Sequence, residues 1–294
     1  MTKKTKIAFT LIELLVVIAI IGILSGLIVV TMNGVTQKAN IAKAQVFSNS
    51  LRNALMANLV AEYKLDGSTS DNWGGINGTW YGSGGGTNTS ANYRPAGECI
   101  SGQCLNFDGT DDYIGCGTAS SLNITSNLSI EAWVKTTAGY KPIAGTWYYL
   151  SAGDMQGYRL DINTDGYGRL VMQSDGSYLF TSTKKINDGA WHHIAATFNP
   201  SNYVRLYIDG AMEQWTSGVP ASINSSTHGF NIGYYYSNGD SFFVGLIDNV
   251  RIFNSAIPTS QMEQSYYSGL NNLLISKNIE KEEYLSMIKN ISKK

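Results

Sequence analysis

The hydrophobic residues of this chain are concentrated near its N-terminus. Residues 9–30 are almost continuously apolar, and the polar side chains within them are Thr10, Glu13 and Ser25. At 1.5 Å per residue, a helix of these 22 residues is long enough to cross a hydrocarbon core about 30 Å thick. The pattern therefore predicts a transmembrane helix over residues 9–30.

Basic residues precede this segment. Lys3, Lys4 and Lys6 hold the N-terminus on the cytoplasmic side of the inner membrane, so we expect the rest of the chain to lie outside. The alternative is a secretory signal peptide, but the apolar run is longer than a typical h-region and no small-residue cleavage site follows it. Glu13 is the informative residue, because a carboxylate in an apolar helix costs roughly 2.5–3.5 kcal/mol and marks a functional candidate.

The helical pattern continues beyond the membrane segment. Apolar residues recur at intervals of three and four as far as Leu59, which predicts one helix from Phe9 to about Tyr63. Such a helix is on the order of 80 Å long. Gly22, Gly26 and Gly34 are the positions at which it is most easily stretched.

The pattern changes at residue 66. Residues 66–97 are rich in Gly, Ser, Thr and Asn, which excludes a helix there. Many strands without intervening helices predict an antiparallel sandwich or barrel. After the sandwich, apolar residues among Lys and Glu in residues 270–294 predict a short amphipathic helix. The expected strands are short β-branched and aromatic runs at 105–107, 113–116, 128–135, 158–162, 169–173, 178–182, 192–198, 204–208, 230–235 and 242–253.

The composition narrows the possible functions. The chain has 294 residues, 43% apolar and only 15% charged, with a net charge of −1. A neutral balance supplies no field to hold a nucleic-acid backbone, so we expect no nucleic-acid partner. The three His residues restrict metal and acid–base chemistry.

The acidic residues argue against an enzyme. A glycosidase of this kind of sandwich needs two carboxylates on one face of a strand. Glu131 stands alone in its strand, and Asp108, Asp111 and Asp112 fall in a turn. His192 and His193 are adjacent on an expected strand and so point to opposite faces. We therefore expect no catalytic site.

The N-terminus resembles that of the type IV pilins and pseudopilins. The run Phe9-Thr-Leu-Ile-Glu-Leu-Leu-Val-Val-Ile-Ala-Ile-Ile-Gly22 after a short basic leader carries the resemblance. It implies that a prepilin peptidase cuts between Ala8 and Phe9, and that the new amine of Phe9 is methylated. The family usually has Gly before the cut, where this chain has Ala8. Glu13 can then neutralise the amine of a neighbouring subunit and set the register between subunits; the alternative is a stray acid in a simple anchor.

A second resemblance covers residues 62–269. Leu105-Asn-Phe-Asp-Gly-Thr-Asp-Asp-Tyr-Ile, Leu128-Ser-Ile-Glu-Ala-Trp-Val-Lys, Trp191-His-His-Ile-Ala-Ala-Thr-Phe and Phe243-Val-Gly-Leu-Ile-Asp-Asn-Val-Arg are similar to the laminin G-like/concanavalin A-like family. The resemblance implies a jelly roll of two packed sheets. It leaves the ligand open, because this fold carries lectins, adhesion modules, spacers and glycosidases.

The same resemblance suggests a calcium site. In this family an Asp of the opening segment often meets an Asp of the last strand, and Ca²⁺ prefers carboxylate, amide and carbonyl oxygens. The candidate ligands are Asp71, the backbone around Gly75, Asn77 and Asp248. The alternative is an Asx-turn together with a buried structural Asp.

Aromatic residues suggest carbohydrate binding. Trp73, Trp80, Trp147, Tyr148 and Tyr235 lie in or near expected loops, where exposed rings and neutral amides could hold a sugar. The alternative is that these rings cover the sandwich or pack on the N-terminal helix. Trp133 and Trp191 occupy strand positions that should face the core.

The cysteines suggest one disulfide. Cys99 and Cys104 flank four residues, a loop short enough to close in the oxidising exterior. Cys116 is then a buried thiol, although its pairing with either of the other two stays open.

The sequence thus predicts an α+β chain of four parts: a leader (1–8), a pilin-like helix (9–63), a β-sandwich (64–269) and a C-terminal helical tail (270–294). The expected function is a pilin-like subunit that presents a binding head on a surface filament, for adhesion or glycan binding. Two alternatives stay open: a minor pseudopilin of a type II secretion-like machine, and a membrane-tethered lectin that does not assemble.

Overall fold

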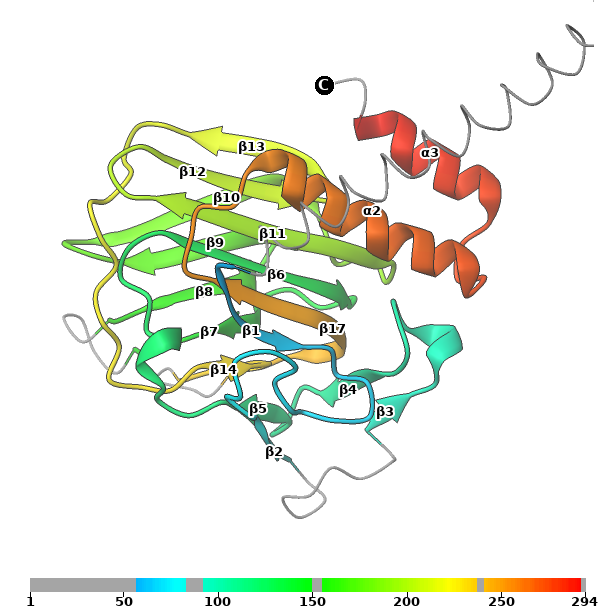
Figure 1. Cartoon of the computed structure of the whole chain (residues 1–294), viewed down its shortest axis with the longest axis horizontal. Helices are drawn as coiled ribbons and strands as arrows, with labels where there is room; N and C mark the ends of the chain where they lie inside the picture. Colours follow the sequence, from blue (N-terminus) through cyan, green and yellow to red (C-terminus); the bar gives the residue numbers. More distant parts are fainter. Residues whose placement is uncertain (1–56, 83–91, 150–154, 237–240, 292–294) are drawn as a thin grey trace, which may run out of the picture. The chain divides into compact units, whose positions relative to one another are not determined.

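The structure, a computed structural model, describes residues 57–82, 92–149, 155–236 and 241–291 (Figure 1). The leader, the membrane segment and most of the expected N-terminal helix lie outside these residues. Among the residues described, no helix combines the length and the apolar character needed to cross a membrane. Residues 55–294 cluster as one compact unit.

Eight strands form the first sheet, called sheet A here. Its hydrogen-bonded order is β13-β12-β11-β6-β17-β4-β3, and β1 also pairs with β17. All of these pairs are antiparallel. The strands are β1 (Leu59–Tyr63), β3 (Tyr93–Arg94), β4 (Cys104–Asp108), β6 (Leu128–Lys135), β11 (Trp191–Asn199), β12 (Tyr203–Ile208), β13 (Ala211–Trp215) and β17 (Val244–Phe253).

Seven strands form the second sheet, sheet B, in the order β10-β9-β8-β7-β14-β5-β2. A two-stranded ribbon, β15 (Tyr234–Tyr235) with β16 (Ser241–Phe242), lies beside it, and the short 3₁₀ helices η1 (Ala96–Glu98) and η2 (Ser120–Leu122) occupy connections. The strands of sheet B are β2 (Thr79–Tyr81), β5 (Tyr113–Gly115), β7 (Lys141–Gly145), β8 (Tyr158–Ile162), β9 (Tyr167–Gln173), β10 (Ser177–Lys185) and β14 (Asn231–Ile232). The antiparallel sandwich expected from the strand pattern is confirmed.

The main hydrophobic core lies between the two sheets. Alternation along β6 shows how the sequence builds it, because successive side chains of a strand point to opposite faces. Ile130, Ala132 and Val134 belong to this core. Glu131 and Trp133 point to the other face of sheet A, where the C-terminal helices pack.

The predicted N-terminal helix does not reach Tyr63. Leu59–Tyr63 is strand β1, which pairs with Val250–Phe253 of β17. Ala61 and Tyr63 are fully buried, and the Tyr63 hydroxyl donates to the carbonyl of Ile76. The helical spacing of the preceding leucines suggested a longer helix, but pairing satisfies the backbone of β17 along an edge that would otherwise be open.

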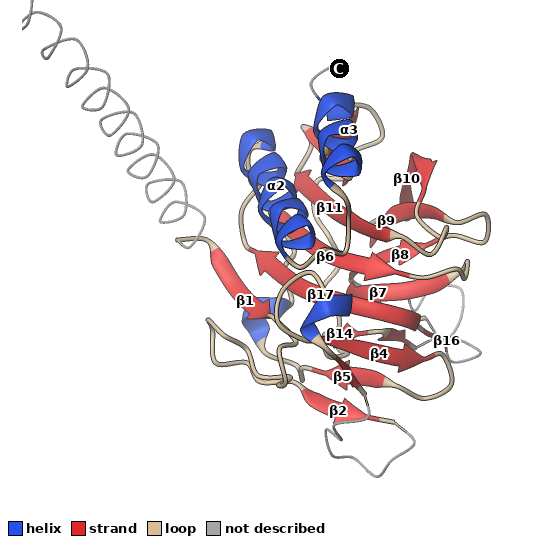
Figure 2. Cartoon of the chain, turned by 90° about the vertical axis from the view of Figure 1, so that its right-hand side faces the viewer, coloured by secondary structure: helices blue, strands red, loops and turns tan. Residues whose placement is uncertain are grey.

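Two C-terminal helices follow the sandwich: α2 (Thr259–Ile275) lies over the outer face of sheet A, and α3 (Lys281–Ile291) packs beside α2 (Figure 2). In α2, four buried side chains recur at helical spacing: Met262, Tyr266, Leu270 and Leu273. The helix α3 follows after a turn. The predicted short C-terminal helix is present as α3, and a further helix, α2, precedes it and spans the predicted boundary at residue 269. Pro258 precedes the first turn of α2, where its missing N–H is no loss.

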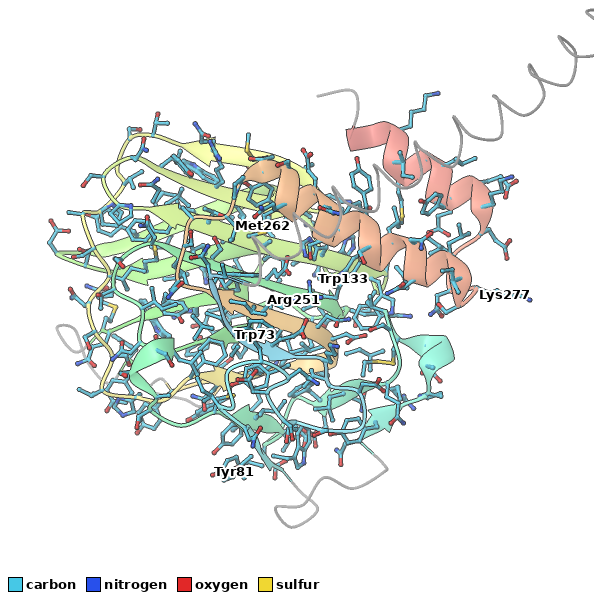
Figure 3. The ribbon with its side chains drawn as sticks, in the orientation of Figure 1. Trp73, Tyr81, Trp133, Arg251, Met262 and Lys277 are labelled. Carbon is cyan, nitrogen blue, oxygen red and sulfur yellow. A yellow bond between two sulfur atoms is a disulfide. The ribbon has the colours of Figure 1, made fainter. Side chains whose placement is uncertain are left out.

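A second, smaller apolar cluster lies between sheet A and these helices. The rings of Trp133 and Tyr266 stack there with centroids 5.6 Å apart, and Trp191 and Leu270 pack against them. Figure 3 marks Trp133 close to α2. Trp133 and Trp191 are buried as expected, but in this cluster rather than between the sheets.

Candidate functional site

An arginine held between two aromatic rings is the central feature of the outer face of sheet B. Strand β8 places Leu160 in the core and directs Arg159 and Asp161 to the opposite face. The guanidinium carbon of Arg159 lies 4.3 Å from the ring centroid of Trp147 and 4.3 Å from that of Tyr235. Two cation–π contacts of this kind restrict the guanidinium to one plane.

Two arginines share one buried carboxylate on this face. Nε of Arg159 donates to Asp161 at 2.6 Å. From β9, Arg169 donates through Nε and Nη2 to both oxygens of the same carboxylate, at 2.7 and 2.8 Å. We call Arg159, Asp161 and Arg169 the arginine row. Its two guanidinium groups and one carboxylate together carry one net positive charge.

One charged donor in this arrangement has no acceptor. Nη1 of Arg159 is buried and makes no hydrogen bond within the described part of the chain, while the buried hydroxyl of Tyr235 interacts with Tyr140. Burial raises the pKa of Tyr235, so its hydroxyl keeps its proton. A buried donor without a partner costs about 1–3 kcal/mol, and a ligand that supplies an acceptor recovers this cost.

Exposed aromatic rings lie beside the arginine. Tyr140 is 50% exposed, and its ring contacts that of Tyr235 edge-on at 6.4 Å. The residues that follow Trp147 and Tyr235 in the chain form a second stack, in which Tyr148 lies flat on His228 and on Tyr236.

Further rings extend this surface toward the edge strand β2. Tyr81 stacks on Tyr113 at 4.6 Å, Tyr113 contacts Tyr234 at 4.8 Å, and Tyr234 stacks on Phe242 at 5.0 Å. Tyr81 is 44% exposed and is marked in Figure 3. We call these rings together with the arginine row the sheet B surface: Tyr81, Tyr113, Tyr140, Trp147, Tyr148, Arg159, Asp161, Arg169, His228, Tyr234, Tyr235, Tyr236 and Phe242. Flat apolar faces beside directed donors match the apolar faces and hydroxyl groups of a sugar ring.

The predicted ligand-binding aromatics do not form one group. Trp147, Tyr148 and Tyr235 come together on the sheet B surface. Trp147 and Tyr235, however, are buried against Arg159 and are not exposed to solvent. Trp73 is 48% exposed in the loop that follows β1. The prediction is wrong for Trp80, which lies on β2 with its ring in the main core, 5.4 Å from that of Phe107. Alternation along β2 buries the middle residue and exposes Tyr81.

Comparison with known families identifies the sandwich. A family model described as the concanavalin A-like lectin/glucanases superfamily matches residues 108–262, which is more than half of the chain. The chain belongs to this superfamily. Residues 3–29 match the prokaryotic N-terminal methylation motif, which confirms the resemblance of the N-terminus to the pilins. No curated protein matches the sequence.

Solved structures share the fold of this superfamily member. Domain 4 of AbnA, a GH43 extracellular arabinanase from Geobacillus stearothermophilus solved with arabinotriose, is 24% identical with a TM-score of 0.56, over 70% of this chain and 97% of that chain. The binding domain of Paraclostridial Mosquitocidal Protein 1 is 17% identical with a TM-score of 0.53, over 74% of this chain and 53% of that chain. The botulinum neurotoxin serotype D binding domain is 13% identical with a TM-score of 0.53, over 75% and 53%. The match spans about half the length of the two toxin chains, and at these identities it shows the fold alone.

The superfamily includes glucanases, so the surroundings of Glu131 are informative. Glu131 is 2% exposed and lies beneath α2, where it accepts hydrogen bonds from Arg251 and Ser265 at 2.9 Å and contacts Nε2 of His193 at 3.2 Å. Burial opposes its ionisation, but the hydrogen bond with His193 and the charge of Arg251 lower the pKa of Glu131 to about 2. Arg251 also pairs with Glu62 of β1 at 2.8 Å. The network ties β1, β6, β11, β17 and α2 together.

Three carboxylates meet in the turn after β4. Oxygens of Asp108, Asp111 and Asp112 lie within 4.8 Å of one another. Asp108 accepts from the backbone N–H of Thr110, and Asp112 accepts from that of Asp108. Burial raises the pKa of Asp112. These hydrogen bonds shape the turn, as expected for Asp in such a position.

The predicted calcium ligands near the start of the sandwich bind their own loop. The carboxylate of Asp71 accepts hydrogen bonds from the backbone N–H groups of Glu62, Trp73 and Ile76, and the side chain of Asn77 accepts from the N–H of Asp71. Gly75 has a φ of +74°. This is the Asx-turn geometry of the alternative interpretation. Calcium binding there stays a prediction.

Asp248, the fourth predicted ligand, belongs to a different set of contacts. Its side chain is fully buried and accepts from the backbone N–H groups of Ile100 and Ser101. Burial raises the pKa of Asp248 well above its ordinary value, and Oδ1 has no partner among the described residues. Within those residues Asp71 and Asp248 share no hydrogen-bond partner. A polar pocket of about 290 Å³ lies nearby, lined by Lys64, Asp66, Ile100, Ser101, Gly102, Trp133, Asn249, Arg251, Ser265, Ser268, Gly269 and Asn272.

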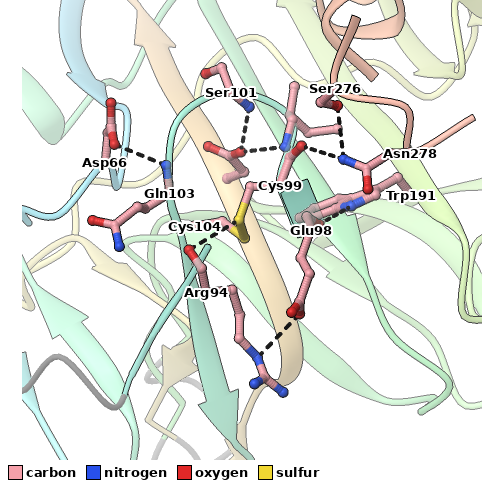
Figure 4. Close-up of a disulfide and its surroundings, with 12 residues drawn as sticks. Asp66, Arg94, Glu98, Cys99, Ser101, Gln103, Cys104, Trp191, Ser276 and Asn278 are labelled. Carbon is pink, nitrogen blue, oxygen red and sulfur yellow. Dashed lines mark hydrogen bonds and ion pairs between the residues drawn. A yellow bond between two sulfur atoms is a disulfide. The ribbon is translucent and has the colours of Figure 1, made fainter. Parts of the chain in front are cut away.

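Cys99 and Cys104 form a disulfide, and Cys116 is a buried free thiol. The loop that the disulfide closes connects separate parts of the domain (Figure 4). Besides holding Asp248, it receives a hydrogen bond from Asn278, which follows α2, at the carbonyl of Cys99. The adjacent carbonyl of Glu98 accepts from the indole of Trp191 on β11.

The predicted processing and assembly residues, Ala8, Phe9 and Glu13, lie outside the described residues. Sequence analysis missed Arg159, Asp161, Arg169 and Tyr140. A signal was present, because β8 reads Tyr-Arg-Leu-Asp-Ile, with charged residues at alternate positions of a strand. Such alternation marks an outward face, but it does not show which aromatic rings lie above it.

Proposed function

We propose that this chain is a type IV pilin-like subunit that presents a carbohydrate-binding sandwich on a cell-surface filament. The methylation motif over residues 3–29 supports the pilin part, and the superfamily of the sandwich supports the lectin part. The observation that carries carbohydrate binding is the buried guanidinium of Arg159, held between Trp147 and Tyr235 with an N–H that has no acceptor among the described residues.

Assembly follows from the charges of the apolar N-terminal segment. The prepilin peptidase removes residues 1–8, and Phe9 becomes a methylated, positively charged amine. Before assembly the subunit is held in the inner membrane by residues 9–30. Glu13 of one subunit neutralises the amine of another, which offsets the burial of both charges. The partners are other pilin subunits, and the sandwich lies outside the cell at the filament surface.

Carbohydrate binding uses the sheet B surface. Tyr140 and Tyr81 offer exposed rings for the apolar face of a sugar, and the donors of the arginine row serve its oxygens. Two fold neighbours support the carbohydrate-binding part of the proposal. The AbnA domain was solved with arabinotriose, and cell entry of botulinum neurotoxin type C is dependent upon interaction with two ganglioside molecules.

A glycan array tests the binding. The full chain, solubilised in detergent, is applied to immobilised oligosaccharides with and without a chelator. We expect binding to at least one glycan, a loss of about tenfold for Tyr140→Ala, and no change for Trp73→Ala. Trp73 is the matched control, because it is about as exposed as Tyr140 but belongs to the loop whose Asp71 accepts a hydrogen bond from Glu62 of β1. Absence of binding to any glycan contradicts the proposal, and loss of binding with the chelator would support the calcium prediction.

Assembly is tested separately. Mass spectrometry of the mature protein should find methylated Phe9 as its first residue. The variant Glu13→Ala should enter the membrane but not reach shed fibres, as seen by electron microscopy with an antibody against the sandwich. A mature chain that still begins at Met1 or Thr2 contradicts filament assembly and favours the membrane-tethered lectin.

A further inference from the structure

We propose that the sheet B surface selects glycans that carry a carboxylate, such as a uronic acid or a sialic acid residue. The inference rests on the proposed function and specifies its ligand class. It starts from Nη1 of Arg159, a charged donor that is buried and has no acceptor in the described chain.

The charge of the site favours an anion. Arg159 and Arg169 face each other across Asp161, whose two oxygens are already occupied by three N–H donors. Among the described residues, one positive charge is therefore left without a counterion on this row. A carboxylate supplies that charge and an acceptor at once, whereas a sugar hydroxyl supplies only the acceptor.

The geometry favours a fixed, planar partner. Arg159 is 7% exposed and is restrained on both sides, by Trp147 and by Tyr235. Its Nε is held by Asp161, so the free N–H points in one direction without further ordering on binding. Because Nε is occupied, Nη1 is the atom left to donate to a carboxylate oxygen of the ligand. The buried hydroxyl of Tyr235, which interacts with Tyr140, is a second polar group on the same stack.

The exposed rings then hold the rest of the sugar. Tyr140 contacts Tyr235 edge-on and exposes half of its surface, so it lies next to the donors and remains open to a ligand. Ring stacking alone does not distinguish neutral from acidic sugars. The arginine therefore decides the charge of the ligand, while Tyr140 contributes affinity for either kind.

The test compares an acidic saccharide with its neutral counterpart. Binding of the full chain in detergent to trigalacturonic acid and to galactotriose is measured by calorimetry or biolayer interferometry. We expect the acidic trimer to bind about tenfold more tightly, with a difference that shrinks as salt is added. A sulfated neutral trimer is the third ligand, and we expect it to bind less tightly than the uronate.

Variants assign the preference to the site. Arg159→Gln should reduce binding of the acidic trimer about tenfold, to the level of the neutral one, and change neutral binding less than about threefold. Arg205→Gln is the control, because Arg205 also lies over a tyrosine, Tyr203 at 3.9 Å, but on sheet A. Tyr235→Phe removes only a hydroxyl, and it replaces Arg159→Gln as the test variant if Arg159→Gln does not fold. It should reduce the acidic preference about threefold.

The outcomes separate the two proposals. Equal binding of acidic and neutral trimers by the unmodified chain, preference for the sulfated trimer, or an acidic preference that survives both Arg159→Gln and Tyr235→Phe overturns the inference and leaves carbohydrate binding intact. Failure of every glycan to bind, on the array and in these assays, overturns carbohydrate binding itself.

Discussion

Replacing Glu131 by Gln tests the hydrogen-bond and ion-pair network that ties α2 to sheet A. The substitution keeps the shape of the side chain but removes its charge. Glu131 is 2% exposed and contacts Arg251, Ser265 and His193. The variant leaves Arg251 with Glu62 as its remaining carboxylate partner. We therefore expect the folded state to lose stability.

The size of the loss follows from the pKa. Burial opposes ionisation of Glu131, yet its partners lower the pKa from 4.5 to about 2. Each pKa unit corresponds to about 1.4 kcal/mol, so the folded state favours the charged form by about 3 kcal/mol. Breaking a buried ion pair typically costs about 3–5 kcal/mol, which agrees with this value. We expect the free energy of unfolding to fall by about 3 kcal/mol at neutral pH.

The pH dependence has a definite sign. Because the pKa of Glu131 is lower in the folded state, its contribution is present above pH 4.5 and is lost as the pH falls toward about 2. The difference between the variant and the unmodified chain should therefore shrink over this range. An unchanged difference would show that packing, rather than charge, is lost.

Urea unfolding followed by tryptophan fluorescence measures this loss. All six tryptophans lie between residues 73 and 215, so in the full chain their fluorescence reports on the sandwich alone. Glu98→Gln is the control, because Glu98 pairs with Arg94 at 3.7 Å at the surface and should change stability by less than about 1 kcal/mol. A loss below about 1 kcal/mol for Glu131→Gln would refute the reasoning, since the desolvation cost would then cancel the pairing.

Two further predictions concern the packing of α2 on sheet A and the loop closed by the Cys99–Cys104 disulfide. Gly269→Ala should lower stability by about 1–3 kcal/mol in the same urea assay despite the better helix propensity of Ala, because a Cβ there would lie 2.4 Å from the Trp133 ring. Gly176→Ala, with open space around the added atom, should have little effect, and equal effects of the two would contradict the packing argument. Replacing Cys99 and Cys104 together by Ser should cost about 2 kcal/mol, since the disulfide closes a loop with a sequence separation of 5. Unfolding that is equally easy with and without reductant would contradict this.

Much of the sandwich could be predicted from local patterns. Residues 128–135 and 158–162 were expected as strands and form β6 and β8 with the same limits. Their alternation of apolar and polar residues reflects a strand with one face in the core, and it needs no knowledge of the partner strand. The end of the N-terminal helix could not be predicted in this way, because Leu59–Tyr63 becomes a strand through its pairing with residues 250–253.

The candidate site shows the same limit. Trp147 and Tyr235 were expected to bind ligand because they are aromatic residues near loops. Arg159 between them was not expected, since nothing near it in the sequence indicates that two rings from other segments will enclose it. The misplacement of Trp80 has the opposite cause, because the two-fold alternation of the short strand β2 was not recognised.

The sequence by itself determined the apolar N-terminal segment with its single acid, the strand-rich head and the pair of cysteines close enough to bond. These features depend on spacing along the chain, which local geometry converts directly into helices, strands and short loops. Only the tertiary structure decided that β1 completes sheet A, that α2 closes over Glu131, and that Arg159 lies between two rings with a donor that no described residue accepts from. Those features depend on which distant segments meet, and that is set by the packing of the whole sandwich rather than by any local period.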